Sequence, residues 1–224
     1  MNLSYDVIIV GAGLSGIGAG RQLIHDCPET NFCILESRTN TGGTWDLFQY
    51  PGIRSDSDMY TMGYSSKPWS NPEAIAKGQS ILSYIREAAD EVKLNEKIHL
   101  SHKVMSASWS DDLNSWELQV QAPHSLISFT CKLLYVCSGY YDYEKAYTPS
   151  FNKQEIFKGK IVHPQFWDKN LKCDNKKITV VGSGATAMTI VPEVSKKAQQ
   201  VNMLQRSPTY VASLPSKDYL AKLT

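Results

Sequence analysis

The stretch YDVIIVGAGLSG, residues 5–16, decides the fold of this chain. It contains four consecutive aliphatic side chains, Val7 to Val10, where a strand with one exposed face would alternate apolar and polar residues. A continuous apolar run is typical of a strand that is buried on both faces of a parallel sheet. The glycine-rich GAGLSG that follows predicts a tight turn into a helix.

The residues after this turn complete a β-α-β unit. A run of small residues predicts a helix from about Leu14 to Asp26, which Pro28 and its polar neighbours end. FCILE, residues 32–36, is the next predicted strand and finishes on Glu36. Strand, helix and strand in this order predict an α/β fold with a parallel sheet.

The turn has the spacing G-x-G-x-x-G at Gly11, Gly13 and Gly16. These glycines let the backbone approach a pyrophosphate, and the helix N-terminus supplies N–H groups and a positive dipole end. Ser15 could donate a further hydrogen bond to phosphate, and Glu36 could accept hydrogen bonds from an adenosine ribose. The alternative is a structural turn with an exposed glutamate. The complete context of strand, turn, helix and acid favours the dinucleotide site.

A second unit of the same plan begins with KITVVGSGATA, residues 177–187. Its turn has the variant G-x-G-x-x-A, formed by Gly182, Gly184 and Ala187. A helix to about Ala198 and the strand VNMLQR follow. Two β-α-β units in one chain are therefore the main organisational prediction.

Arg206 ends the second strand of this unit at the place where Glu36 ends its counterpart. A guanidinium binds a 2′-phosphate bidentately, whereas a carboxylate would repel it. Ser207 and Thr209 are possible helpers, although Arg206 could instead be a solvated cation at a strand end. One turn for a free ribose and one for a phosphorylated ribose indicate FAD and NADPH. The predicted NADP contacts of this unit are Gly182, Ser183, Gly184, Ala185, Thr186, Ala187, Arg206 and Ser207.

Between the two units, KVMSASWS, SWELQVQ and LISFTC predict a small antiparallel meander at about residues 103–131. LLYVCSG is predicted to be a further strand that rejoins the parallel sheet. The predicted fold class is α/β, with two three-layer Rossmann-like dinucleotide-binding units, both incomplete, and this meander. We assign residues 1–145 to an FAD-binding domain, 146–176 to a linker and 177–224 to the start of an NADPH-binding domain.

The segment from residue 37 to residue 71 is rich in Gly, Ser, Pro and Asp and has no convincing period. Long irregular segments of compact proteins are usually functional or disordered. Its many aromatic side chains argue against disorder. SILSYIREAADEV, residues 80–92, then predicts an amphipathic helix.

The composition is that of an ordinary soluble globular protein, with 42% hydrophobic and 20% charged residues. A net charge of +1 provides no general attraction to nucleic acid or anionic lipid. The five cysteines form no C-x-x-C pair, which indicates a reducing, cytoplasmic setting and no metal site. We expect neither a secretion signal nor a transmembrane segment.

Two longer patterns narrow the reaction. GGTWDLFQYPGIRSD, residues 42–56, has the spacing Gly-Gly-x-Trp, four residues, Tyr-Pro-Gly, three residues, Asp. The pattern F-x-G-x-x-x-H-x-x-x-W-D is present as Phe157, Gly159, His163, Trp167 and Asp168. Together with both glycine turns, these patterns resemble the Baeyer–Villiger, or class B, flavoprotein monooxygenases. The resemblance covers nearly the whole chain and is strongest to the branch of ethionamide-activating and long-chain-alkane monooxygenases.

The resemblance implies roles for individual residues. Asp56 matches the acid that orients a catalytic arginine near the flavin, and Arg54 and Ser55 border the nicotinamide site together with Asp56. His163 and Trp167 would couple cofactor binding to domain rotation, whereas in isolation they would be a packed histidine and a core tryptophan. Asp56 in isolation would be a turn residue. The FAD contacts that the motif and the resemblance imply are Gly11, Gly13, Ser15, Gly16, Glu36, Gly43, Thr44, Trp45, Asp46, Leu47, Asp56 and Val104.

The implied enzyme is an FAD- and NADPH-dependent monooxygenase that acts through a flavin peroxide. It would insert one oxygen atom of O2 into a ketone, giving an ester or lactone, or oxidise a thioether. Family members are longer, and their catalytic arginine lies beyond the second unit, so we expect an N-terminal fragment that is poorly stable and inactive alone. The alternatives are an N- or S-oxidising flavin monooxygenase and a nucleotide-binding remnant without turnover. A disulfide reductase is disfavoured because no cysteine pair has the required spacing.

Overall fold

A computed structural model describes residues 2–213, 215 and 217 of the chain. Its elements group into two compact units, each of which is described by itself. Unit 1 consists of Met1–Asp46, Tyr64–Lys67 and Ile81–Tyr140, and unit 2 of Leu47–Gly63, Pro68–Ser80 and Tyr141–Thr224. The irregular segment predicted for residues 37–71 therefore contributes to both units.

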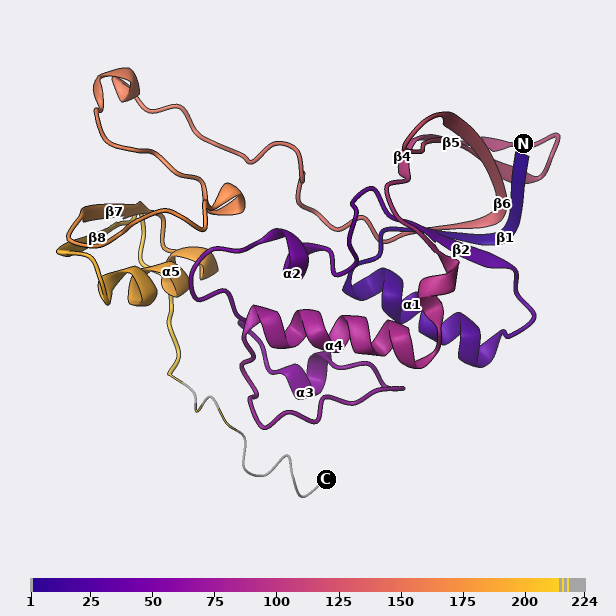
Figure 1. The fold of residues 1–224 in the computed structure, drawn as a ribbon, viewed down its shortest axis with the longest axis horizontal. Helices are drawn as coiled ribbons and strands as arrows, with labels where there is room; N and C mark the ends of the chain where they lie inside the picture. The colour runs from indigo at the N-terminus through magenta and orange to yellow at the C-terminus, as the bar shows by residue number, and fades with distance from the viewer. Residues whose placement is uncertain (1, 214, 216, 218–224) are drawn as a thin grey trace. The chain divides into compact units, whose positions relative to one another are not determined.

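Unit 1 is built on a six-stranded mixed sheet with the strand order β3-β2-β1-β6-β5-β4 (Figure 1). The central strand β1 (Asn2–Val10) is parallel to β2 (Phe32–Leu35) on one side and to β6 (Leu126–Val136) on the other. The short strand β3 (Ile98–His99) continues the parallel part beyond β2. The predicted β-α-β unit and its parallel sheet are confirmed.

The antiparallel part of the sheet is the predicted meander, with β4 (Lys103–Ser110) and β5 (Ser115–Gln121) beside β6. The prediction of two separate strands, LISFTC and LLYVCSG, is wrong because LISFTC and LLYV lie in the single strand β6. Cys131 pairs with Trp116 of β5 and also with Tyr5 of β1, so one strand serves both halves of the sheet. Strand β1 begins at Asn2, three residues before the predicted YDVIIV, and these additional residues pair with Ser128–Thr130 of β6.

Helix α1 (Leu14–Asp26) covers one face of the parallel strands at close range. A Cβ atom added to Gly16 would lie 3.5 Å from Ile9 Cγ2, and one added to Gly20 would lie 3.1 Å from Ile34 Cδ1. Glycines on this side of the helix therefore let its backbone approach the sheet. The opposite face packs against the meander through a buried cluster of Ile8, Cys33, Leu35, Leu118, Val120, Phe129 and Cys131.

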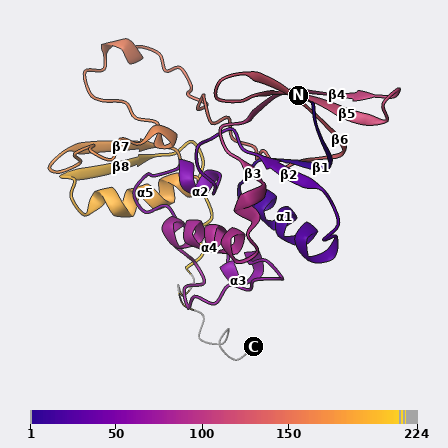
Figure 2. The ribbon, with the colours of Figure 1, turned by 45° about the vertical axis from the view of Figure 1, so that its right-hand side comes forward.

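The other helices of this region are α2 (Thr44–Leu47), α4 (Gly78–Glu91) and the 3₁₀ helix η1 (Leu94–Lys97). The predicted helix over residues 80–92 is confirmed as α4. Figures 1 and 2 show α4 beside α1 on the same side of the sheet. The two helices form one layer, and the parallel strands lie above them.

Unit 2 contains a two-stranded parallel sheet of β7 (Lys177–Val181) and β8 (Gln200–Leu204), joined by α5 (Ala185–Ser195). The second predicted β-α-β unit is confirmed, although its helix ends at Ser195 rather than near Ala198. The irregular segment contributes α3 (Met59–Met62), a single helical turn. Two 3₁₀ helices, η2 (Gln154–Ile156) and η3 (Pro164–Phe166), lie in the predicted linker.

Among the described residues, α4 is the longest helix, with 14 residues. None of the helices in this described part of the chain combines the length and the apolar character that crossing a membrane requires. Over the same residues, the His, Cys, Asp and Glu side chains form no group of three or more that could hold a metal ion.

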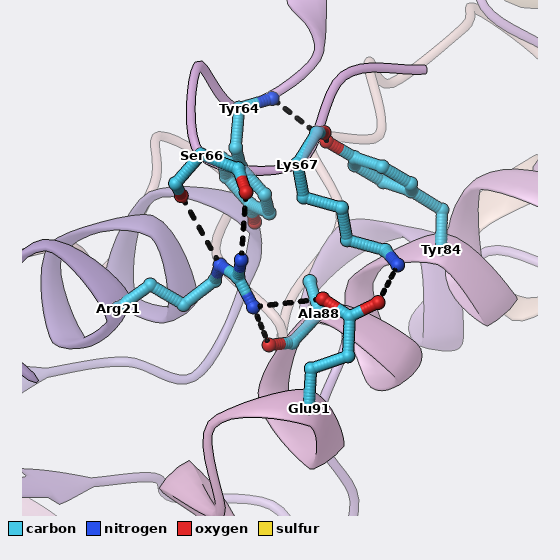
Figure 3. Close-up of polar contacts among 7 residues, drawn as sticks. All are labelled: Arg21, Tyr64, Ser66, Lys67, Tyr84, Ala88 and Glu91. Atoms are coloured by element: carbon cyan, nitrogen blue, oxygen red, sulfur yellow. Dashed lines mark hydrogen bonds and ion pairs between the residues drawn. The ribbon is translucent and has the colours of Figure 1, made fainter. Parts of the chain in front are cut away.

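Arg21 of α1 fastens residues Tyr64–Lys67 to α1 and α4 (Figure 3). Its side chain is 6% exposed, and it donates from Nε to Ser66 Oγ at 3.4 Å and from Nη2 to Ser66 O at 3.1 Å. Nη1 donates to Ala88 O and pairs with Glu91 Oε2 at 3.2 Å. A buried guanidinium is tolerated here because acceptors surround its planar donor fork.

Tyr64 fixes the same short stretch against the start of α1. Its hydroxyl donates to Leu14 O at 2.6 Å, and its backbone N–H donates to the Tyr84 hydroxyl at 2.7 Å. The rings of Tyr64 and Tyr84 stack with their centroids 5.4 Å apart. Gly18 makes room for the ring, because a Cβ atom there would lie 2.8 Å from Tyr64 Cε1. Burial raises the pKa of Tyr64, so its hydroxyl keeps its proton at neutral pH.

Replacing Arg21 with methionine (Arg21→Met) is expected to lower the free energy of unfolding by about 2–3 kcal/mol, because Ser66 O and Ala88 O lose their buried donor. Urea denaturation of the purified chain measures this loss. Lys132→Met is the matched control, since Lys132 pairs with Asp6 at 2.8 Å but its side chain is 77% exposed. The control should leave the unfolding midpoint unchanged. An equal shift in both variants would contradict a specific role for Arg21.

Candidate functional site

The first glycine turn lies between β1 and α1 in unit 1, and its backbone is crowded. Gly11 has a φ of +103°, and a Cβ atom there would lie 2.5 Å from Cys137 O. A Cβ atom on Gly16 would lie 1.8 Å from Gly11 O. Only glycine fits either position, so the predicted turn has the tight geometry that lets backbone N–H groups face a phosphate.

Gly13 is the N-cap of α1 and makes no side-chain cap hydrogen bond. The N–H groups of the first helical turn, which includes the exposed Ser15, have no acceptor within a helix and are suited to an external anion. A Cβ atom on Gly13 would lie 3.5 Å from the Cα atom of Gly43, so the GGTWD loop lies directly against this turn. The structure thus brings Gly13 and Gly43 together, as the sequence predicted for one binding region, and Ser15 lies in the helical turn that Gly13 caps.

Glu36 is 4% exposed, so the alternative of an exposed glutamate is wrong. Its Oε2 accepts from Ala12 N at 2.7 Å, and its Oε1 accepts from Arg38 N at 2.9 Å and from Ser37 Oγ at 3.3 Å. The carboxylate thereby ties the glycine turn to the loop after β2. A carboxylate has about four acceptor positions, so these bonds leave room for a ribose hydroxyl. Ribose binding by Glu36 stays a prediction.

Asp46 is 8% exposed and lies between two arginines. Its Oδ2 is 2.8 Å from Arg38 Nη2, and its Oδ1 is 2.6 Å from Arg86 Nη2. Arg38 also donates to Gly43 O at 3.2 Å, and Arg86 to Thr41 O at 3.2 Å. Sequence reasoning missed both arginines. Arg38 follows Glu36 by two residues and could have been suspected, whereas no local signal joins Arg86 of α4 to this loop.

The remaining predicted FAD contacts lie on other elements of the chain. Thr44 and Trp45 are partly buried in α2. Val104 is partly buried in β4, where the pairing with β5 shifts register at a bulge. Leu47 and Asp56 belong to unit 2. The roles of all five residues in flavin binding stay predictions.

The second glycine turn, in unit 2, has an open surface. Gly182 has a φ of +120° and donates its N–H to Leu204 O at 2.8 Å, but a Cβ atom on Gly182 or Gly184 would meet nothing within 4 Å. Gly184 is the N-cap of α5, and Ala187 is buried in the first turn of that helix. The turn therefore has the predicted shape, with space beside it for a ligand.

Two hydroxyl groups brace this second turn. Ser183 Oγ donates to Ser207 O at 3.3 Å, and Thr209 Oγ1 donates to Ser183 Oγ at 2.8 Å. The structure thus places Ser207 and Thr209 at the turn, as predicted. Arg206 follows β8 and is exposed, in contrast to the buried Glu36 at the equivalent position of unit 1. Its binding of a 2′-phosphate stays a prediction.

Arg54, Ser55 and Asp56 lie on a short antiparallel ladder in unit 2. Ser55 is 3% exposed, donates its N–H to Ala76 O at 2.8 Å and accepts from Ala76 N with Oγ at 3.0 Å. Arg54 forms a bridge with Lys77. The Ser55 hydroxyl therefore has a structural role in this ladder, whereas Arg54 and Asp56 are exposed and free to face a ligand.

In the F-x-G-x-x-x-H pattern, His163 is the N-cap of η3, and its Nδ1 accepts from Gln165 N at 3.2 Å. This bond places the ring proton of neutral His163 on Nε2. Gln165, which the sequence analysis missed, is 7% exposed and donates from Nε2 to Asp142 O at 2.7 Å. The interpretation of His163 as a hydrogen-bonded histidine in a linker is confirmed, and its part in domain rotation stays a prediction.

The other members of this pattern surround the η3 turn in sequence. A Cβ atom on Gly159 would lie 2.4 Å from Cζ of the exposed Phe157 ring, so the glycine accommodates that ring. Trp167 is only partly buried and is not a core residue. Asp168 is exposed, accepts from Asn170 N at 2.9 Å and pairs with Lys160 at 3.5 Å.

The variant Gly16→Ala tests the first turn. Its Cβ atom would overlap Gly11 O, so we expect FAD binding to weaken by at least about 100-fold, the effect of displacing the phosphate-binding amides. Titration of the chain with FAD, followed by flavin fluorescence, measures the affinity.

Gly184→Ala in the other unit is the control, because its Cβ atom would meet open space. It should leave FAD affinity unchanged. Wild-type affinity of Gly16→Ala would exclude this turn as the flavin site.

The chain is similar in sequence to a known protein family and to individual curated proteins. The family model for flavin-binding monooxygenase-like proteins matches residues 4–220. The chain is 49% identical over 218 residues to the FAD-containing monooxygenase EthA of Mycobacterium tuberculosis, covering 97% of this chain and 45% of that protein. It is 46% identical over 222 residues to the probable FAD-binding monooxygenase AlmA of Acinetobacter baylyi, covering 98% of this chain and 45% of the relative. The chain therefore spans less than half the length of these curated relatives.

Solved structures share the fold. An oxidised steroid monooxygenase bound to NADP matches 92% of this chain and 39% of its own, with a TM-score of 0.79 and 28% identity. A cyclohexanone monooxygenase in a rotated conformation matches 100% of this chain and 43% of its own, with a TM-score of 0.84. At 21% identity the second likeness concerns the fold alone. Both support the α/β architecture described above.

Proposed function

Because the chain belongs to the flavin-binding monooxygenase-like family, we propose that it supplies the FAD-binding and NADPH-binding turns of a monooxygenase. The observation that carries this proposal is that the two glycine turns differ in the charged residue that follows the second strand of each β-α-β unit. That residue is the buried Glu36 in unit 1 and the exposed Arg206 in unit 2. An acid suits a free ribose, and a guanidinium suits a phosphorylated one. The names of the curated relatives support a flavin enzyme.

The first turn fits the pyrophosphate of FAD, because Gly11 and Gly16 form a cradle that a Cβ atom would fill. In the proposed complex, amides of the first turn of α1 bind phosphate, and Glu36 adds a ribose hydroxyl to its backbone donors. FAD, when bound, supplies the redox and oxygen-activating chemistry. The proposed FAD contacts are Gly11, Gly13, Ser15, Gly16, Glu36, Gly43, Thr44, Trp45, Asp46, Leu47, Asp56 and Val104.

The second turn fits NADPH, because space is open beside Gly182 and Gly184 and Arg206 is exposed at the end of β8. The turn is braced by Ser183, whose hydroxyl bonds with Ser207 and Thr209 hold it in place. Arg206 would bind the 2′-phosphate bidentately. The proposed NADP contacts are Arg54, Ser55, Asp56, Gly182, Ser183, Gly184, Ala185, Thr186, Ala187, Arg206 and Ser207.

The proposed reaction inserts one oxygen atom of O2 into a ketone, giving an ester or lactone, or transfers it to a thioether. Oxygen transfer of this kind develops negative charge, which a cation must stabilise. The exposed carboxylate of Asp56 has the wrong sign for that task and would instead hold such a cation in place. In the same proposal, His163 and Trp167 couple coenzyme binding to a movement of the linker.

We also place the chain in the cytoplasm. Its five cysteines, Cys27, Cys33, Cys131, Cys137 and Cys173, are all free thiols. Free thiols in this number are typical of a reducing compartment. Detection in a cytosolic fraction would support this assignment.

Coenzyme preference tests the proposed function. The wild-type chain should bind NADP⁺ at least about tenfold more tightly than NAD⁺, and Arg206→Gln should remove most of that preference by deleting a charge-assisted bidentate contact. Isothermal titration calorimetry with both coenzymes measures this. Lys177→Gln is the control, because Lys177 is exposed at the start of β7, at the end of the two-stranded sheet opposite to Arg206. This variant should keep the preference for NADP⁺. Equal affinities of the wild-type chain for NADP⁺ and NAD⁺ would refute the two-coenzyme proposal.

Oxygen consumption tests whether the 224-residue chain can carry out the proposed oxygenation by itself. The 224-residue chain, loaded with FAD, is expected to show no ketone-stimulated oxygen uptake with NADPH, because the carboxylate of Asp56 cannot supply the positive charge that the proposed oxygen transfer needs. An oxygen electrode measures uptake with a cyclic and a long-chain ketone, and flavin fluorescence in the same sample verifies loading. Uptake that rises with ketone concentration would show that the chain suffices for catalysis.

A further inference from the structure

The Tyr-Pro-Gly part of the GGTWDLFQYPGIRSD signature packs directly on α5 within unit 2. Gly52 has a φ of +77°, and a Cβ atom there would lie 2.8 Å from Thr189 O and 2.6 Å from Glu193 Cγ. Thr189 O belongs to the helix backbone, which cannot move aside without breaking α5. The chain after α2 runs beside α5 in both ribbon views (Figures 1 and 2). A side chain at residue 52 would separate the two segments.

Tyr50 makes a second contact with the same helix. Its hydroxyl lies close to the side chain of Thr186, which is in the first turn of α5 directly after the glycine turn. Burial raises the pKa of Tyr50, with a smaller contribution from the nearby Asp56 carboxylate. The phenol therefore keeps its proton at neutral pH and is placed to form a hydrogen bond with the Thr186 hydroxyl.

The residues after Gly52 are rigidly attached to this contact. Gly78 donates its N–H to Ile53 O at 2.8 Å, and the Ser55 amide and hydroxyl both bond to Ala76. The ladder therefore starts one residue after the point where the chain touches α5. Any displacement of Gly52 would move the whole ladder and the exposed side chains that it presents.

We propose that Tyr50-Pro51-Gly52 is a contact segment, called the seat below, that fixes the Arg54–Asp56 ladder to the first turns of α5. Gly52 is a positioning residue because it allows backbone contact, and Tyr50 is one because it orients the Thr186 hydroxyl at the coenzyme turn. The inference rests on the proposed function only where it concerns NADPH. The packing itself is a property of the chain without ligand.

The first test uses amide hydrogen exchange of the full 224-residue chain without coenzyme. Gly52→Ala should make the Ser55 and Gly78 amides exchange about tenfold faster, since the left-handed φ and the overlap with Thr189 O both oppose a Cβ atom. Gly139→Ala is the matched control, because Gly139 has a φ of +72° but a Cβ atom there would meet nothing within 4 Å. It should leave these two amides at their wild-type rates.

The second test measures NADP⁺ affinity by calorimetry in a double-mutant cycle. Tyr50→Phe should weaken NADP⁺ binding about threefold, the usual effect of one lost hydrogen bond. In a Thr186→Val background the same substitution should have no further effect, because the hydroxyl that Tyr50 orients is already absent. Tyr60→Phe is the control, since Tyr60 loses a comparable bond from its hydroxyl to Asn71 O, 2.8 Å long, in the same unit. It should bind NADP⁺ like the wild-type chain.

The outcomes separate the seat from the proposed function. Unchanged exchange of the Ser55 and Gly78 amides in Gly52→Ala, or equal acceleration in Gly139→Ala, overturns the seat whether or not coenzyme binds. Additive losses in the Tyr50 and Thr186 cycle overturn the orienting role of Tyr50. A wild-type chain that binds no NADP⁺ contradicts the proposed coenzyme instead, and hydrogen exchange then decides the seat alone.

Discussion

The buried carboxylate of Glu36 is the interaction on which unit 1 depends most. It accepts the Ala12 amide from the glycine turn and the Arg38 amide from the loop after β2, and Ala12 O in turn accepts Gly42 N at 2.9 Å. A carboxyl group is costly to bury without partners, and backbone donors offset that cost when they are held in place. One side chain thereby joins the ends of β1 and β2 to the GGTWD loop. The same arrangement leaves acceptor capacity at the place where a ribose is proposed to bind.

The two glycine turns share the spacing G-x-G-x-x-(G/A), but different contacts hold each of them in shape. Around Gly11 and Gly16 the backbone is so close that a Cβ atom would collide with carbonyl oxygens, so the turn is shaped by packing. Around Gly182 a Cβ atom would meet open space, and side-chain bonds from Ser183 to the chain after β8 hold the turn instead. The first turn is built into a core, whereas the second depends on surface groups such as Arg206. In the proposed complex, coenzyme selectivity is therefore easier to change at the second turn.

The irregular segment of residues 37–71 forms specific contacts in each unit. Tyr64 fastens it to the first residue of α1 in unit 1, and Gly52 fastens it to the side of α5 in unit 2. Each contact is made to a helix that follows a glycine turn. Between these contacts the segment presents Arg54 and Asp56 from a hydrogen-bonded ladder. Its richness in glycine, proline and aromatic residues follows from these close contacts, since they need tight backbone approach and flat side chains.

The sequence by itself determined both β-α-β units, the meander and the α4 helix, because apolar runs, glycine spacing and helical periodicity act over a few residues. It also indicated the candidate binding residues, from Gly11 to Arg206. Only the tertiary structure decided that β6 is one strand, that Asp46 pairs with Arg38 and Arg86, and that Gly52 touches α5. Each of these features joins segments far apart in the chain. No local period records such contacts, because they arise only when the chain folds and brings the groups together.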